Sequence, residues 1–73
     1  MAKLNSLMRT IPGGDNVIIC DYLNNYQEYF NSVTNDFFEN GCVKSVFANI
    51  KNAPVYKLSA ANGFIIIEIC LDK

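Results

Sequence analysis

The sequence predicts a single α+β domain over residues 1–73, in which one long amphipathic helix packs on a three-stranded antiparallel sheet. Three observations favour this class. Residues 19–39 carry apolar side chains at helical spacing, residues 42–71 hold three apolar stretches separated by turn signals, and 51% of the 73 residues are hydrophobic. A chain of this length supports one hydrophobic core, so we expect one domain.

A short helix is expected first, within residues 2–11. Its apolar side chains recur at positions i, i+3, i+4 and i+7, the spacing of one helical face: Leu4, Leu7, Met8 and Ile11. Pro12 and the two glycines after it cannot continue a helix easily and favour a turn.

The long helix is predicted over residues 19–39. Its apolar positions are separated by four and three residues in alternation: Ile19, Leu23, Tyr26, Phe30, Val33 and Phe37. At about 100° per residue they fall on one face of a helix. Asn40 and Gly41 follow, and a glycine here tolerates the left-handed conformation that ends many helices.

The start of this helix has an alternative. Val17 and Ile18 project onto the polar face of the predicted helix, and the run of β-branched residues is typical of a strand. Residues 16–22 then form a first strand, and Asn25 with Glu28 forms the capping box that opens the helix. The fold becomes a four-stranded sheet with β-α-β-β-β order, and the sequence leaves both versions open.

The C-terminal half contains the clearest turn. Asn62 and Gly63 separate two apolar stretches, which is the strongest local signal for a hairpin because both central residues of a type I′ turn need positive φ. Placing Ala61 opposite Phe64 puts Lys57 opposite Glu68, a pair of opposite charges that supports the same register.

A second hairpin is predicted through residues 51–54, with Ile50 opposite Val55. The result is a meander of strands 42–50, 55–60 and 64–71. The apolar side chains of the predicted helix, between residues 19 and 37, would cover one face of this meander. The last strand lies at the edge and is rich in apolar residues, so we expect it to pair with residues 16–22 or with a second molecule. The side chains that would form such an oligomer edge are Phe64, Ile66, Glu68 and Cys70.

Charge is distributed unevenly along the chain. Residues 15–40 contain five acidic residues and no Lys or Arg, although the net charge of the whole chain is only −1. On the predicted helix the acids gather opposite the apolar face. This indicates a stripe that docks on the basic surface of a protein partner, or, alternatively, a plain solvated face. The candidate partner-binding residues are Asp21, Glu28, Asp36, Glu39, Asn35 and Asn25.

The sequence lacks the usual signs of catalysis and cofactor binding. It has no His, the commonest general base near neutral pH, and its glycines match neither a P-loop nor a dinucleotide fingerprint. Cys20, Cys42 and Cys70 lack the spacing of a metal site and are expected to be reduced. We therefore predict no enzyme activity, no cofactor and no metal. The net charge and a pI near 5.0 also disfavour direct nucleic-acid binding.

Taken together, these features predict a non-enzymatic protein-binding module. Small chains of this type are common among phage and mobile-element inhibitors of the anti-CRISPR or anti-restriction kind. Two alternatives remain: a self-assembling homodimer or oligomer that uses the 64–71 edge, and a small nucleic-acid-binding regulator. No signal peptide or membrane-spanning segment is evident, so we expect the protein in the cytoplasm, that of the host cell if a phage encodes it.

Overall fold

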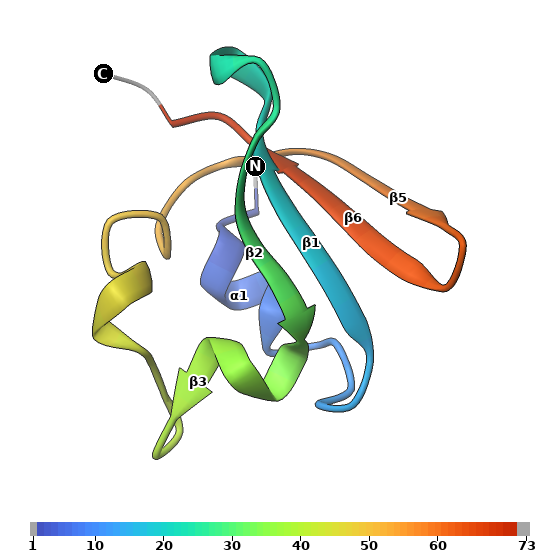
Figure 1. Cartoon of the computed structure of the whole chain (residues 1–73). Coiled ribbons are helices and arrows are strands. Elements are labelled where there is room, and N and C mark those ends of the chain that lie inside the picture. Colours follow the sequence, from blue (N-terminus) through green and yellow to red (C-terminus); the bar gives the residue numbers. More distant parts are fainter. Residues whose placement is uncertain (1, 72–73) are drawn as a thin grey trace.

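The computed structural model describes residues 2–71 and consists mainly of strands (Figure 1). Its elements follow this order: α1 (Leu4–Met8), β1 (Asn16–Asp21), η1 (Tyr22–Asn24), β2 (Gln27–Val33), η2 (Thr34–Phe37), β3 (Phe38–Glu39), β4 (Cys42–Val43), η3 (Ser45–Phe47), β5 (Val55–Ala61) and β6 (Phe64–Ile69), where η marks a 3₁₀ helix. The predicted fold class, with its long helix, is therefore wrong.

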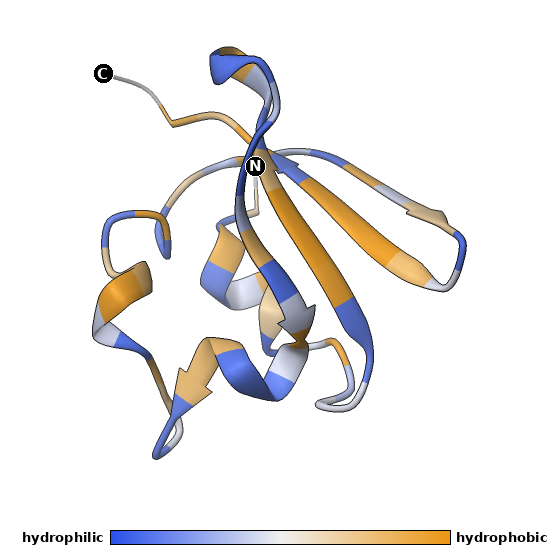
Figure 2. Cartoon of the chain, viewed as in Figure 1, coloured by the Kyte–Doolittle hydropathy of each residue, from blue (hydrophilic) through white to orange (hydrophobic). Residues whose placement is uncertain are grey.

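Four strands form one mixed sheet in the order β2-β1-β6-β5, and β3 pairs with β4 in a separate two-stranded sheet. The two central strands, β1 and β6, run parallel, whereas each outer strand is antiparallel to its neighbour. The sheet is thus two hairpins, β1-β2 and β5-β6, joined side by side through their apolar strands, which form the long orange bands in Figure 2.

The predicted helix over residues 19–39 is replaced by β1, η1, β2 and η2. The reason lies at Asn25 and Tyr26, whose φ angles of 55° and 59° are left-handed and cannot continue an α-helix. The chain reverses there, so that Ile19 pairs with Phe30 across two antiparallel strands. Leu23, from the same predicted helical face, is 57% exposed.

The alternative reading was correct for one element. Residues 16–21 do form a strand, and this strand pairs with β6, which confirms the expectation that the 64–71 stretch pairs with residues 16–22. The β-α-β-β-β order is nevertheless wrong. Glu28 lies within strand β2 rather than in the first turn of a helix opened by Asn25.

The predicted C-terminal hairpin is confirmed with its register. Ala61 pairs with Phe64 and Lys57 with Glu68, and the chain turns at Asn62 and Gly63 with φ angles of 54° and 82°. These positive values are what a type I′ turn requires.

The prediction of a strand over residues 42–50 is wrong. A second Asn-Gly turn, at Asn40 and Gly41 with φ angles of 55° and 80°, joins the short strands β3 and β4 rather than ending a helix. Beyond β4 the chain turns through η3, where the backbone N–H of Phe47 donates to the Lys44 carbonyl and that of Ile50 to the Phe47 carbonyl. These turns carry Ile50 into the hydrophobic core, where it is fully buried.

One face of the four-stranded sheet carries the hydrophobic core. The N-terminal helix expected within residues 2–11 is present as α1, which packs Leu4 and Met8 against this face. Phe37 and Ile50, from the 34–53 segment, also pack on this face. Strands β1 and β6 contribute four buried side chains to the core: Val17, Ile19, Ile67 and Ile69. Among the described residues, no helix has the length and apolar character needed to cross a membrane.

Candidate functional site

The acidic residues that the sequence placed on one helical face lie on several parts of the molecule. Glu28 is exposed on β2, Asp36 is exposed on η2, and Glu39 is exposed on β3. Each sits on a different element because the chain reverses after η1 and bends again after β2. Within residues 2–71 these three acids therefore do not share one helix, and the sequence prediction of an acidic helix is wrong.

Asp21, the first acid of the predicted stripe, is a buried structural residue with 3% exposure. Its carboxylate accepts hydrogen bonds from the backbone N–H groups of Leu23 at 3.0 Å and Leu71 at 3.5 Å. The first of these bonds caps the 3₁₀ turn η1, and the second fixes the chain just beyond β6. Asp21 thus stabilises the end of the sheet and has no free surface for a partner.

The two asparagines predicted to contact a partner also lie apart. Asn25 is exposed and adopts the left-handed conformation that ends η1. Asn35 lies in η2, at the other end of β2 from Asn25. Its backbone N–H donates to the Gly13 carbonyl at 2.9 Å. Its side chain lies so close to Gly13 that a Cβ there would collide with Asn35 Oδ1.

The strand predicted to form an oligomer edge, β6, does not lie at the edge of the sheet. Strand β6 is internal, paired with β1 on one side and β5 on the other, so its backbone cannot add a further strand. Three of the side chains named for this role share one face of β6, and the fourth follows directly after the strand: Phe64, Ile66, Glu68 and Cys70. Each of them is half-buried.

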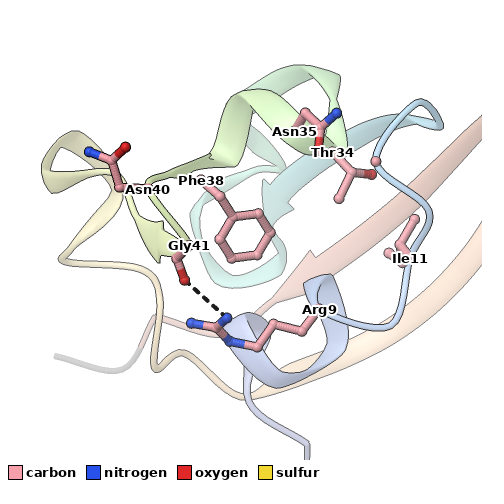
Figure 3. Close-up of a pocket in the computed structure, with 8 residues that line it drawn as sticks. Arg9, Ile11, Thr34, Asn35, Phe38, Asn40 and Gly41 are labelled. Carbon is pink, nitrogen blue, oxygen red and sulfur yellow. Dashed lines mark hydrogen bonds between the residues drawn. The ribbon is translucent and has the colours of Figure 1, made fainter.

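A hollow of about 490 Å³ lies between the end of α1 and the β3-β4 turn (Figure 3). Arg9 projects into it, placing its guanidinium carbon 5.3 Å from the centre of the Phe38 ring and donating a hydrogen bond to the Gly41 carbonyl at 3.2 Å. Asn35 and Thr34 line the far side. Both contacts of Arg9 hold the β3-β4 hairpin against α1, so this cation already has a role in the fold.

A second hollow, which we call the β2 groove, runs beside the outer strand β2 and has a volume of about 420 Å³. One wall is β2 itself and the other is the turn around η3. Its lining residues are Tyr29, Phe30, Asn31, Ser32, Asp36, Lys44, Val46 and Phe47. Figure 1 shows the two segments that supply these walls, β2 and the yellow segment that contains η3.

Two properties make the β2 groove the stronger candidate site. First, β2 ends the sheet, so alternate backbone N–H and C=O groups along it point away from β1 and toward the groove. Second, Val46 on the opposite wall is 72% exposed, the highest value among the exposed large apolar residues of the described chain. An unpaired strand edge next to an apolar wall is the arrangement that binds extended peptides by strand addition.

The charges around the groove are of both signs. Asp36, which accepts a hydrogen bond from the Ser32 hydroxyl, and Lys44 both line it, while Glu28 lies one residue before Tyr29 on β2. The two carboxylates and the one ammonium group therefore give this region a net charge of about −1. Residues 2–71 contain no group of three or more His, Cys, Asp or Glu side chains arranged to hold a metal ion.

Comparison with known proteins leaves the structure as the basis for any functional conclusion. No family model matches the chain, and no curated protein or solved structure matches it either.

Sequence reasoning missed this groove because its two walls come from separate elements. Lys44 and Val46 were assigned to a strand that does not form, and Tyr29 was assigned to a helix. One signal was present: Asn40 and Gly41 match the turn pattern of Asn62 and Gly63, and a hairpin there ends the preceding element before residue 40.

The three thiols differ in environment and should differ in reactivity. Cys42 is exposed, whereas Cys20 is buried and its Sγ donates to the Ile67 carbonyl at 3.8 Å. Burial raises the pKa of the Cys20 thiol, and the nearby carboxylates of Glu68, Glu28 and Asp21 raise it further.

We expect iodoacetamide to modify Cys42 first, and to modify Cys20 more than about tenfold more slowly in native protein. In urea the two rates should be equal. Peptide mapping by mass spectrometry after timed quenching measures both, and equal native rates would contradict this placement.

Proposed function

We propose that this protein is a non-enzymatic protein-binding module that takes up an extended segment of a partner along the free edge of β2. The observation that carries the proposal is the β2 groove, in which an unpaired strand edge faces the exposed side chain of Val46. Backbone hydrogen bonds to β2 would supply affinity, and side-chain contacts with the opposite wall would supply selectivity.

The lining residues also define the chemistry of the partner. An apolar side chain of the bound segment would lie on Val46 and Phe47, and a Lys or Arg would reach Asp36. Asp36 and Glu28 near the edge retain, in a different geometry, the preference for a basic partner. An inhibitor of the phage or mobile-element type could act in this way by occupying an extended basic segment of its target.

The proposal is tested by selecting binders from a library of random linear peptides. We expect enriched peptides to combine β-branched or aromatic residues with Lys or Arg, and to shift the amide NMR signals of Tyr29 and Asn31. Shifts centred on β5, the other outer strand, would contradict the proposed site. Peptides without basic residues would contradict the proposed partner chemistry.

Two substitutions should weaken binding of a selected peptide. Val46→Asp places a charge on the apolar wall, and Asp36→Lys reverses the charge that meets a basic residue. Each is expected to raise the Kd about tenfold or more, equivalent to at least about 1.4 kcal/mol. The matched controls are Leu58→Asp and Glu39→Lys, both at exposed positions outside the groove. Equal losses in variants and controls, measured by fluorescence polarisation, would show that the groove is not the binding site.

A further inference from the structure

The four-stranded sheet has two faces, and within residues 2–71 the surrounding helices and turns place their buried side chains on only one of them. α1, η2 and the 38–53 segment all contribute to the core on that side. We call the other side the open face. The strand registers arrange it in three rows that cross β2, β1, β6 and β5 in turn: Glu28, Cys20, Glu68 and Lys57; Asn31, Ile18, Ile66 and Ser59; and Val33, Asn16, Phe64 and Ala61.

The open face is too apolar for a solvated sheet surface. Ile18 and Ile66 are directly paired at its centre, and Phe64 and Val33 lie in the next row. All four side chains are half-buried, and none of them belongs to the hydrophobic core or packs against it. An antiparallel or mixed sheet that faces water normally alternates toward polar residues on that side, so this face resembles one inner surface of a sandwich.

The charges on the open face are arranged with opposite signs at its two edges. In the first row, Glu28 stands on the outer strand β2 and Lys57 on the outer strand β5. Three strand spacings, roughly 14 Å, separate them. Glu68 lies between them, directly opposite Lys57 on the neighbouring strand.

We propose that a second copy of this chain covers the open face, with a two-fold axis running along the sheet between β1 and β6. This rotation exchanges the two edges of the sheet. It places Glu28 over the partner's Lys57 and Lys57 over the partner's Glu28, and it places Ile18 over the partner's Ile66. The opposite charges at the two edges and the apolar side chains at the centre thus meet under this rotation, as a two-fold interface requires.

The size of the open face sets the expected strength of the dimer. Four strands of about six residues bury on the order of 1,000 Å² in total when two such faces meet, at the lower end for a specific interface. We therefore expect a reversible dimer with a Kd in the micromolar range, rather than an obligate one. The β2 groove borders the open face, because Asn31 belongs to both, but the dimer proposal does not rest on the peptide site.

The first test is the oligomeric state of the full chain as a function of concentration. Sedimentation equilibrium from about 5 to 500 μM should show a monomer–dimer equilibrium. Dilution should shift the amide NMR signals of Ile18, Ile66 and Phe64 while leaving those of α1 unchanged. A monomer throughout this range, or concentration-dependent shifts on another surface, would overturn the proposal.

The second test is a charge exchange. Glu28→Lys and Lys57→Glu each bring like charges together across the two-fold axis and should each raise the dimer Kd about tenfold. The double variant restores both pairs and should return the Kd to within about threefold of the starting value. A double variant as weak as the single ones would refute this arrangement of the two copies.

Ile66→Lys tests the apolar centre of the open face, with Leu58→Lys as its matched control. Leu58 is an exposed apolar residue of the neighbouring strand β5, but it lies on the other face of the sheet. We expect dimerisation to be lost in the first variant and retained in the second. Circular dichroism checks that both are folded, and the dilution shifts of the unmodified protein decide the question if Ile66→Lys is unfolded. Dimerisation that survives in folded Ile66→Lys would overturn the proposal.

Discussion

Replacing Phe37 with Ala is expected to remove a large part of the stability of the fold. Phe37 is fully buried, and its ring stacks on Phe47 at 5.0 Å between centroids and contacts Phe30 and Phe38 edge-on. A Phe→Ala change at such a position costs about 3–5 kcal/mol, because the apolar surface is lost and a cavity remains. A domain of 73 residues is stable by only roughly 4–11 kcal/mol.

Urea unfolding followed by circular dichroism measures this loss, and the matched control is Tyr26→Ala. Tyr26 is also aromatic, but its side chain is 56% exposed and contacts Tyr22 at the surface. Its removal should cost less than about 1 kcal/mol. Similar losses at the two positions would mean that the aromatic cluster around Phe37 is not the centre of the core.

The same cluster explains how so few regular elements cover the sheet. Phe37 comes from η2 and Phe47 from η3, two short 3₁₀ turns on either side of the β3-β4 hairpin. Their stacked rings close the core where a long helix would otherwise be needed. The hairpin in turn is held to α1 by Arg9, through Phe38 and the Gly41 carbonyl.

The parts of the fold that the sequence predicted correctly are those fixed by local chemistry. Asn62 and Gly63 require positive φ in a tight turn, and the register of β5 on β6 follows from that turn alone. Leu4 and Met8 lie one helical turn apart and form the buried side of α1. In both cases the residues that decide the structure are close together in the sequence.

The predictions that failed depended on contacts between distant residues. Apolar positions at intervals of four and three residues fit a helix, but in the structure Ile19 of β1 and Phe30 of β2 lie side by side in the sheet and are buried in the hydrophobic core. Asn25 offered a local warning, because asparagine enters the left-handed conformation more readily than most residues. For the β2 groove the Asn40-Gly41 turn gave only a partial signal: it ends the preceding element, but it does not show that later turns place Val46 and Tyr29 in one groove.

Ile19 and Leu23 provide the sharpest experimental distinction between a helix and the observed strand. A helix over residues 19–39 would place both side chains on one buried face, so Ala at either position would be similarly costly. In the structure Ile19 is fully buried between Phe30 and Ile67 in the sheet, whereas Leu23 is 57% exposed in η1. We expect Ile19→Ala to cost about 2–5 kcal/mol.

Leu23→Ala should change the free energy of unfolding by less than about 1 kcal/mol, because it removes little buried surface. The backbone N–H of residue 23, which donates to the Asp21 carboxylate, is also unaffected by the substitution. Denaturation in urea, with the slope of the transition checked for each variant, compares the two directly. Since the sheet buries one and leaves the other in water, equal destabilisation would be incompatible with strand β1 ending at Asp21.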